Sequence, residues 1–203
     1  GILMTNRPEF LAATFGIALA GGVATTLSTF STPAELEHLI GVSGVSVLLL
    51  ERQVLKKDFA AILGELDPAI AGGTAGAIAS NKYPFLSHVA AIGEATGAIE
   101  NWDAFLARGA GVAQAQVDAR AATNSPADPG VLFFSSGSTA MPKGILSSHR
   151  GVTLQLWRWP KWYAAKPGEL RMWSANGFFW SGNFAMALGG SLTRGGSLVL
   201  QST

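Results

Sequence analysis

The sequence contains no cysteine and few charged residues. Only 13% of its 203 residues are charged and 48% are hydrophobic, whereas about a quarter of an ordinary globular chain is charged. The absence of cysteine excludes a disulfide scaffold, a cysteine nucleophile and a thiolate metal site. The high hydrophobicity excludes intrinsic disorder. The formal net charge is only +1, so the chain as a whole offers no basic field to nucleic acid.

Charge is entirely missing from two long runs, residues 10–34 and 172–193. A membrane-spanning helix needs roughly 20 predominantly apolar residues. Gly21 and Gly22 divide the first run, and Asn176 lies within the second. Both patterns favour buried helices and strands, so we expect a cytoplasmic protein with no transmembrane segment and no signal peptide. The chain begins inside an apolar run without an initiator methionine, which indicates a fragment.

Helical and strand patterns alternate along the chain. Ser31–Glu35 predicts a helix start, because Pro33 fits the first helical turn and an acidic residue follows it. Val45–Leu50 is a continuous apolar run, as in a strand that is buried on both faces. This alternation predicts an α/β fold with a largely parallel sheet flanked by helices. Residues 64–84 and 109–130 lack periodicity and are predicted to be a loop and a linker.

One Ser- and Gly-rich stretch carries the strongest chemical signal. It follows a strand predicted at Val131–Phe134 and precedes a helix that Ser148 is expected to cap. Backbone N–H groups in such a loop form an anion-binding nest, hydroxyls add donors, and a lysine adds positive charge for phosphate. The residues predicted to bind phosphate are Ser135, Ser136, Gly137, Ser138, Thr139 and Lys143. The alternative is a simple surface turn. A Walker A loop is excluded, because Pro142 and Gly144 flank the lysine.

Residues Ser135–Gly144 resemble the phosphate loop of the adenylate-forming enzymes, which include acyl-CoA synthetases, firefly luciferase and the adenylation domains of peptide synthetases. The usual pattern is Thr-Ser-Gly-Ser/Thr-Thr-Gly-x-Pro-Lys-Gly, and here Ser135 replaces the threonine and Ala140 the second glycine. Asn6–Phe10 resembles the opening helix of the family's CoA ligases. Residues 176–182 occupy the place of the acyl-pocket motif, in which Trp180 replaces the histidine. The resemblance implies a substrate pocket that includes Phe179, Trp180 and Gly182.

The same resemblance implies a function for the complete enzyme. It would be an acid–thiol ligase that joins a carboxylic acid, expected to be a fatty acid, to ATP and then transfers the acyl group to CoA, with Mg²⁺ on the phosphates. Residues 1–203 would be part of the large N-terminal, AMP-binding domain. The family's Thr-Glu motif and the lysine of the small C-terminal domain lie downstream. We therefore expect no catalytic residue and no metal ligand within this chain, and no activity from it alone.

Two other functions stay open. The chain could be a stand-alone nucleotide- or phosphate-binding module without catalysis, or part of an adenylate-forming enzyme other than a CoA ligase. Five of the six tryptophans lie between Trp157 and Trp180. Base stacking is one interpretation of such a cluster, but packing of a helix on a sheet is favoured for all of them except Trp180.

Overall fold

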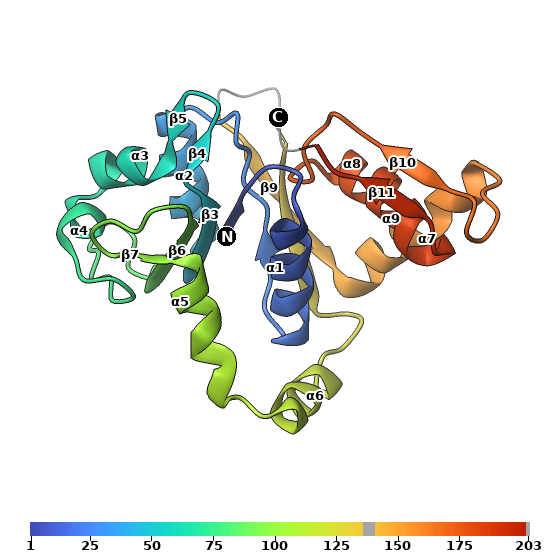
Figure 1. Ribbon diagram of the computed structural model, residues 1–203, viewed down its shortest axis with the longest axis horizontal. Helices are drawn as coiled ribbons and strands as arrows, with labels where there is room; N and C mark the ends of the chain where they lie inside the picture. The colour runs from blue at the N-terminus through green and yellow to red at the C-terminus, as the bar shows by residue number, and fades with distance from the viewer. Residues whose placement is uncertain (136–140, 202–203) are drawn as a thin grey trace.

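The computed structural model describes residues 1–135 and 141–201. Figure 1 shows the arrangement of the elements. The helices are α1 (Pro8–Leu19), α2 (Pro33–Ser43), α3 (Phe59–Leu66), α4 (Pro68–Gly72), α5 (Trp102–Ala107), α6 (Gln114–Ala122), α7 (His149–Trp162), α8 (Ser181–Asn183) and α9 (Gly189–Arg194), with a 3₁₀ turn at Arg108–Gly111 and a π-helical turn at Phe184–Leu188. The strands are β1 (Ile2–Leu3), β2 (Ala24–Thr25), β3 (Val47–Glu51), β4 (Gln53–Val54), β5 (Lys57–Asp58), β6 (His88–Ile92), β7 (Ile99–Asn101), β8 (Pro129–Ser135), β9 (Lys143–Ser148), β10 (Arg171–Trp173) and β11 (Ser197–Val199).

Most strand pairs are parallel. The largest sheet has the order β1-β3-β6-β7, and each neighbouring pair in it is parallel. A second sheet has the order β2-β8-β9, in which β2 and β8 are parallel and β8 and β9 antiparallel. Strands β10 and β11 form a separate parallel pair, and β4 and β5 form a short hairpin. The predicted α/β class with largely parallel strands is confirmed, with the strands divided among several sheets.

The four-stranded sheet is buried on both faces. Along β3, Leu48 and Leu50 belong to a core that they share with α2 and α3, whereas Leu49 belongs to a second core that includes Phe10 of α1. Successive side chains of a strand point to opposite faces of a sheet. Figure 1 shows α2 and α3 on one side of this sheet and α1 on the other. Because both faces of β3 contact an apolar core, the run from Val45 to Leu50 contains almost no polar residue.

Helix α2 begins where the sequence predicts. The Thr32 hydroxyl accepts a hydrogen bond from the backbone N–H of Glu35 at 3.3 Å, and the Glu35 carboxylate accepts one from the N–H of Thr32 at 2.7 Å. This reciprocal capping box satisfies two N–H groups that the helix leaves without partners. Gly44 ends the helix with φ of +59°, a left-handed conformation that costs glycine little.

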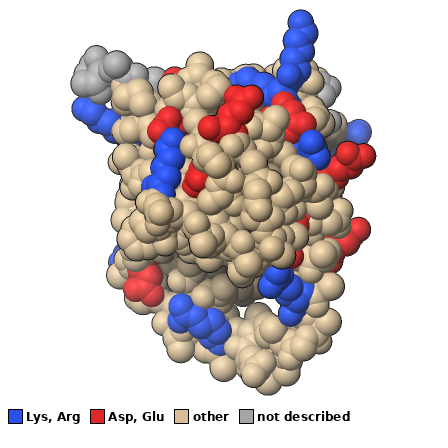
Figure 2. All heavy atoms as spheres, turned by 90° about the vertical axis from the view of Figure 1, so that its left-hand side faces the viewer, with Lys and Arg blue, Asp and Glu red and all other residues tan. Residues whose placement is uncertain are grey.

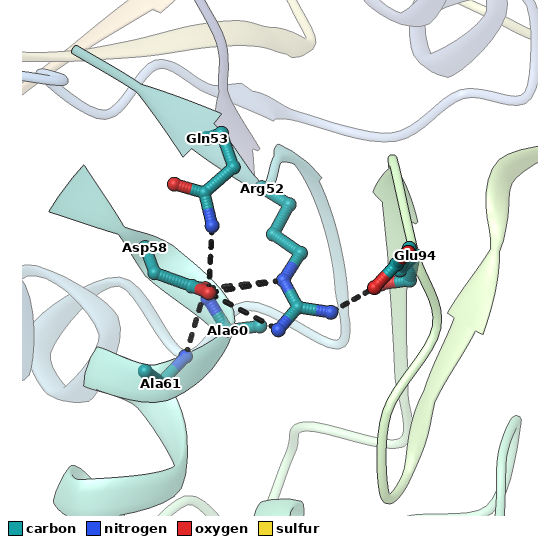
Figure 3. Close-up of polar contacts among 6 residues, drawn as sticks. All are labelled: Arg52, Gln53, Asp58, Ala60, Ala61 and Glu94. Atoms are coloured by element: carbon teal, nitrogen blue, oxygen red, sulfur yellow. Dashed lines mark hydrogen bonds and ion pairs between the residues drawn. The ribbon is translucent and has the colours of Figure 1, made fainter. Parts of the chain in front are cut away.

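The β4–β5 hairpin is tied to α3 through one carboxylate (Figure 3). The Asp58 side chain accepts hydrogen bonds from the N–H groups of Ala60 and Ala61 and from the guanidinium of Arg52. Burial opposes the charge on Asp58, but these donors outweigh it, so the pKa of the carboxyl lies below its ordinary value. Arg52 also donates to the carbonyl of Glu94 at 2.9 Å, which attaches the segment after β6.

Two predicted irregular stretches contain helices. Residues 64–84 include α4, for which the Asp67 carboxylate accepts the Ala69 N–H at 3.0 Å. Residues 109–130 include α6, for which Gln116 accepts the Ala113 N–H at 3.1 Å. These two predictions were wrong because both helices depend on local caps. Helix α6 buries none of its residues, so it has no apolar stripe to reveal it in the sequence.

The tryptophans differ from their expectation as well. Packing into the core was predicted for most of them, yet Trp157, Trp162 and Trp173 are 52%, 75% and 56% exposed. Trp180, the predicted exception, is 49% exposed. Trp157 and Trp162 are exposed because they lie on α7, which buries only Pro160 among its residues, whereas Trp173 is at the end of β10.

Candidate functional site

The predicted phosphate-binding segment connects the two strands of a β-hairpin. Strands β8 and β9 pair antiparallel, and Ser135 at the end of β8 is opposite Lys143 at the start of β9. A hydroxyl and an ammonium-bearing residue therefore occupy adjacent strands at one end of the sheet. The predicted phosphate ligands Ser136, Gly137, Ser138 and Thr139 lie outside the described residues.

Strand β9 was not predicted, so the observed order of elements after β8 differs from the expected one. The sequence suggested a strand, a loop and then a helix, but a six-residue strand lies between the loop and α7. Its first four residues are exposed, so it lacks the apolar run of a buried strand. The predicted cap of α7 is confirmed, because the Ser148 hydroxyl accepts the Gly151 N–H at 3.2 Å.

A cavity of about 420 Å³ brings the end of β8 together with the predicted substrate segment. Ser135 and Pro142 contribute to one part of its wall, and Phe179 and Trp180 to another. The remaining lining residues are Thr26, Ser28, Phe30, Ser31, Glu35, Leu39, Phe133, Phe134, Ile145 and Ser181. Lys143 and Gly182 are not among them. Five phenyl or indole rings in the wall give the cavity an apolar, aromatic character with a few hydroxyls.

The backbone before Trp180 is held by a buried asparagine near the start of the chain. Asn6 accepts the Phe178 N–H at 2.8 Å and donates to the Asn176 carbonyl at 2.7 Å. Asn6 is only 6% exposed, so both hydrogen bonds are shielded from water. Thr26 adds a third tie by donating to the Phe179 carbonyl at 3.1 Å. These contacts fix the direction in which the segment enters the cavity wall.

Gly182 does not line the cavity, but it leaves space for the indole of Trp180, which does. A Cβ atom built on Gly182 would lie 2.6 Å from the indole of Trp180, closer than carbon atoms approach in proteins. The indole therefore rests directly on the glycine backbone. Phe179 is positioned differently, since its ring meets that of Phe30 edge to face with centroids 5.8 Å apart.

His38 is not among the site residues that the sequence predicted, but it contacts the predicted phosphate segment. Its Nε2 atom lies 3.0 Å from the Pro142 carbonyl oxygen. The carbonyl can only accept, so this hydrogen bond requires the proton on Nε2. His38 projects from α2, which is 104 residues away along the chain. No local sequence signal marks such a contact.

The carboxylate of the cavity wall belongs to Glu35. Hydrogen bonds from the backbone and hydroxyl of Thr32 lower the pKa of Glu35 below its ordinary value. Across residues 1–135 and 141–201, no three His, Asp or Glu side chains come close enough to hold a metal ion. The Ser135 hydroxyl and the Lys143 ammonium fit a phosphate, whereas the described residues supply no cage for Mg²⁺.

A model of one protein family matches the whole chain. The match covers residues 1–203, and the family is described as AMP-binding enzyme. The chain belongs to the AMP-binding enzyme family. This confirms the resemblance to adenylate-forming enzymes that the sequence showed around Ser135–Gly144.

Curated AMP-binding enzymes in the same family include several CoA ligases. Long-chain-fatty-acid–CoA ligase ACSBG2 of Mus musculus is 29% identical over 154 residues, which make up 75% of this chain and 21% of the relative. 4-Coumarate–CoA ligase 2 of Oryza sativa subsp. japonica is 30% identical over 154 residues, which make up 74% of this chain and 24% of the relative. The chain thus spans about a quarter of the length of these relatives or less.

Solved structures of AMP-binding enzymes share the fold. An anthranilate CoA ligase in complex with anthranoyl-AMP matches with a TM-score of 0.72 at 21% identity, covering all of this chain and 35% of that one. The apo structure of MbtA from Mycobacterium smegmatis matches with a TM-score of 0.72 at 22% identity, covering all of this chain and 34% of that one. At this identity the likeness establishes the fold alone. No helix within the described part of the chain is long and apolar enough to cross a membrane.

Proposed function

We propose that this chain belongs to an ATP-dependent carboxylate–CoA ligase that activates a fatty acid. The observation that carries the proposal is the hairpin register, which sets Ser135 opposite Lys143 beside a cavity walled by Phe179 and Trp180. Membership in the AMP-binding family and the CoA ligases among its relatives support the reaction type. The fatty-acid relative supports the choice of acid.

In this proposal the residues around the hairpin hold the phosphates of ATP. A carboxylate oxygen attacks the α-phosphorus, and the bond to the bridging oxygen breaks so that pyrophosphate leaves with the electron pair. The ammonium of Lys143 and the hydroxyls of Ser135, Ser136, Ser138 and Thr139 stabilise the charge on the leaving group. The substrate is already an anionic nucleophile, so no side chain has to remove a proton from it. Mg²⁺ arriving with ATP would neutralise further phosphate charge.

The second step passes the acyl group to CoA. The thiol sulfur bonds to the acyl carbon, the thiol proton passes to water, and AMP leaves with the electron pair of the broken bond between the acyl carbon and the phosphate oxygen. No described residue is assigned a proton-transfer role in this step. We place its catalytic groups in the remainder of the large domain and in a small C-terminal domain, so that residues 1–203 alone would form neither acyl-AMP nor acyl-CoA. We also propose that the enzyme is cytoplasmic.

The acid itself is proposed to enter beside Phe179 and Trp180. The half-exposed indole of Trp180 stands where the acyl-pocket motif that the sequence resembles has a histidine, and it occupies space that a smaller side chain would leave open. Gly182 allows the indole to take this position. Trp180 would therefore limit how deep the acyl chain reaches.

Calorimetric titration of the purified chain with ATP tests the proposal. Lys143→Ala should weaken binding by roughly 10- to 150-fold, because a hydrogen bond to a charged group contributes about 1.5–3 kcal/mol. The matched control is Lys56→Ala, an exposed lysine of the β4–β5 hairpin, which should leave affinity unchanged. Equal affinity in the parent and Lys143→Ala would count against the site.

A second assay separates the ligase from a stand-alone nucleotide-binding module. The gene product at its full length, given ATP, a long-chain fatty acid and CoA, should release pyrophosphate and form the thioester. The 203-residue chain should release none. Nucleotide binding without product from the full-length protein would favour the stand-alone module, and product from an aromatic acid only would correct the substrate class.

A further inference from the structure

The wall of the 420 Å³ cavity includes a turn between β2 and α2. The Ser28 carbonyl accepts the Ser31 N–H at 3.1 Å, and the Ser28 hydroxyl accepts the Phe30 N–H at 3.1 Å. A serine at the first position of a four-residue turn commonly binds the backbone two residues further on. Ser28 therefore fixes the turn locally and sets Phe30 at its third position.

Lys57 holds the same turn from another part of the fold. Its ammonium donates to the Thr29 carbonyl at 3.0 Å and to the Ser31 carbonyl at 2.9 Å, so one cation binds both neighbours of Phe30. Thr29 and Ser31 are 6% and 8% exposed, which leaves little room for water to replace the ammonium. Phe30 between them is 70% exposed and lines the cavity.

The backbone that carries Lys57 is itself fixed. Strand β5 pairs with β4, where Lys57 is opposite Val54, a buried residue of the core that α2 and α3 share. The next residue, Asp58, binds Arg52 and the N–H groups at the start of α3 (Figure 3). The position of the ammonium is therefore set by the hairpin and the core together.

Lys57 makes a different contact from other cations of the chain. The face in Figure 2, which is the left-hand side of Figure 1 and carries the β4–β5 hairpin, shows acidic and basic side chains next to one another. Lys82 pairs with the carboxylate of Glu37 at 2.6 Å. Lys57 instead donates to two backbone carbonyls of the cavity wall. Hydrogen bonds from an ionised donor are stronger than neutral ones, so Lys57 holds the turn more firmly than a neutral side chain could.

The ring of Phe30 contacts a residue of the predicted substrate segment. Phe30 and Phe179 pack edge to face with centroids 5.8 Å apart, and both line the cavity. Thr26 donates to the Phe179 carbonyl, so the backbones that carry both rings are held in place. The two rings therefore limit the width of the cavity at this point.

We propose that Phe30 determines which carboxylic acids the cavity accepts and that Lys57 positions it for this role. The Phe30 ring beside Phe179 admits an unbranched acyl chain and excludes an acid with a bulky ring next to its carboxylate. An apolar pocket discriminates between such acids by the space that its walls leave. Lys57 touches no substrate and acts through the carbonyls on either side of Phe30. The proposal rests on the proposed function in taking a carboxylic acid as the ligand.

Calorimetric titration of the full-length protein with two acids measures this selectivity without requiring turnover. Dodecanoate is the unbranched probe, and 4-octylbenzoate is a ring-bearing probe of similar length. The parent should bind dodecanoate more tightly, and Phe30→Ala should shift the ratio of the two dissociation constants about tenfold or more towards 4-octylbenzoate. The matched control is Phe85→Ala, which removes a 68% exposed ring elsewhere and should leave the ratio unchanged.

Lys57→Met tests the positioning role, because it keeps an apolar stem and removes the donor. Amide hydrogen exchange at Phe30 and Ser31 should become faster, and the ratio of dissociation constants should shift in the same direction as in Phe30→Ala. Lys57→Arg keeps a charged donor and should restore the parent ratio. The matched control is Lys56→Met, which changes the adjacent exposed lysine and should alter neither measurement. Unchanged circular dichroism shows that each variant is folded.

Thioester formation separates this role from the proposed function. If the parent forms thioester, Lys57→Met should raise the KM for dodecanoate and leave the KM for ATP unchanged. An altered acid ratio in Phe30→Ala, without thioester from any form of the protein, would reject the ligase and support the role of Phe30. Thioester from the parent with an unchanged ratio in Phe30→Ala would reject the role of Phe30 and keep the ligase.

Three further results would overturn the proposal. The first is a parent protein that binds neither acid, and the second is a shift in Phe85→Ala or Lys56→Met as large as that in the variants they control. The third is Lys57→Met with the exchange rates and acid ratio of the parent, which would show that the turn keeps its position without the ammonium.

Discussion

Helices α2 and α7 are held in the molecule in different ways. Helix α2 has 11 residues, a reciprocal capping box, a left-handed terminal glycine and three buried apolar side chains, Leu36, Leu39 and Ile40. Helix α7 has 14 residues and a single Ser148 cap, and it buries only Pro160. The longer helix thus buries fewer of its side chains in the core.

The same contrast extends to the regions around the two helices. In the described part of the chain before residue 136, apolar side chains fill both faces of the four-stranded sheet. In the described part after residue 140, the buried apolar side chains are Pro160, Phe178, Phe184, Ala187 and Leu188. We therefore expect substitutions before residue 136 to change the free energy of unfolding most, and substitutions on the exposed side of α7 to change it little.

The largest expected difference comes from truncating a leucine in each region. Leu50→Ala in β3 removes a fully buried side chain and should lower the free energy of unfolding by about 3 kcal/mol. Leu154→Ala on α7, where the leucine is 45% exposed, should cost less than about 1 kcal/mol. Urea denaturation monitored by circular dichroism gives both values. Similar losses would mean that α7 is packed as firmly as the sheet.

Alanine in place of glycine should have opposite effects at two positions. Gly182→Ala must displace the indole of Trp180 and should destabilise the protein by about 1–2 kcal/mol. Gly151→Ala lies in the first turn of α7, where the nearest atom to the new Cβ is 3.4 Å away, and should stabilise the protein by roughly 0.5–1 kcal/mol. Melting temperatures of the two variants check the signs. Stabilisation by Gly182→Ala would show that the indole has another place to go.

Removing the caps compares the ends of the two helices. Thr32→Ala should cost about 1 kcal/mol, since it removes the hydroxyl that accepts the Glu35 N–H and donates to the Glu35 carboxylate at the start of α2. Ser148→Ala breaks one hydrogen bond of α7 and should cost less. Chemical denaturation of both variants provides the measurement, with Ser43→Ala at the end of α2 as the control for a serine outside a cap. The reverse order would weaken the distinction between the helices.

The smallest effect is a pH dependence at α2. Hydrogen bonds from Thr32 lower the pKa of Glu35 in the folded chain, so the ionised carboxylate stabilises the fold. This contribution is present above the pKa of the unfolded chain and is lost as pH falls through the lower folded value. The gap in stability between the parent and Glu35→Gln should therefore shrink between pH 6 and pH 3, while the effect of Ser148→Ala should not change. A constant gap would contradict this.

The features that the sequence predicted correctly depend on neighbours in the chain. The α2 start follows from Thr32, Pro33 and Glu35, and β3 follows from its own apolar run. Strand β9 and helix α6 were missed because their residues are largely exposed and carry no apolar period. Their positions come from pairing with β8 and from caps.

The candidate site also contains residues that the local sequence predicted and contacts that it could not predict. The composition of the loop, and then its family likeness, predicted Ser135 and Lys143 as phosphate ligands, roles that stay predictions. The contacts of His38 with Pro142 and of Asn6 with Phe178 join residues 104 and 172 positions apart. Such pairs follow only from the folded chain, which is why His38 was assigned no part in the site.

The long separation between Asn6 and Phe178 also bears on how the chain is made. At about 5–20 residues per second, a ribosome needs on the order of 10–30 s to add the residues that separate them. During that interval the ring of Phe10, which finally packs 5.6 Å from that of Phe178, has no such partner. Part of the apolar side of helix α1 therefore stays exposed to solvent during this interval. The nascent chain exposes this apolar surface of α1 until residue 178 has been added, and the wall of the 420 Å³ cavity is completed only when Phe179, Trp180 and Ser181 follow.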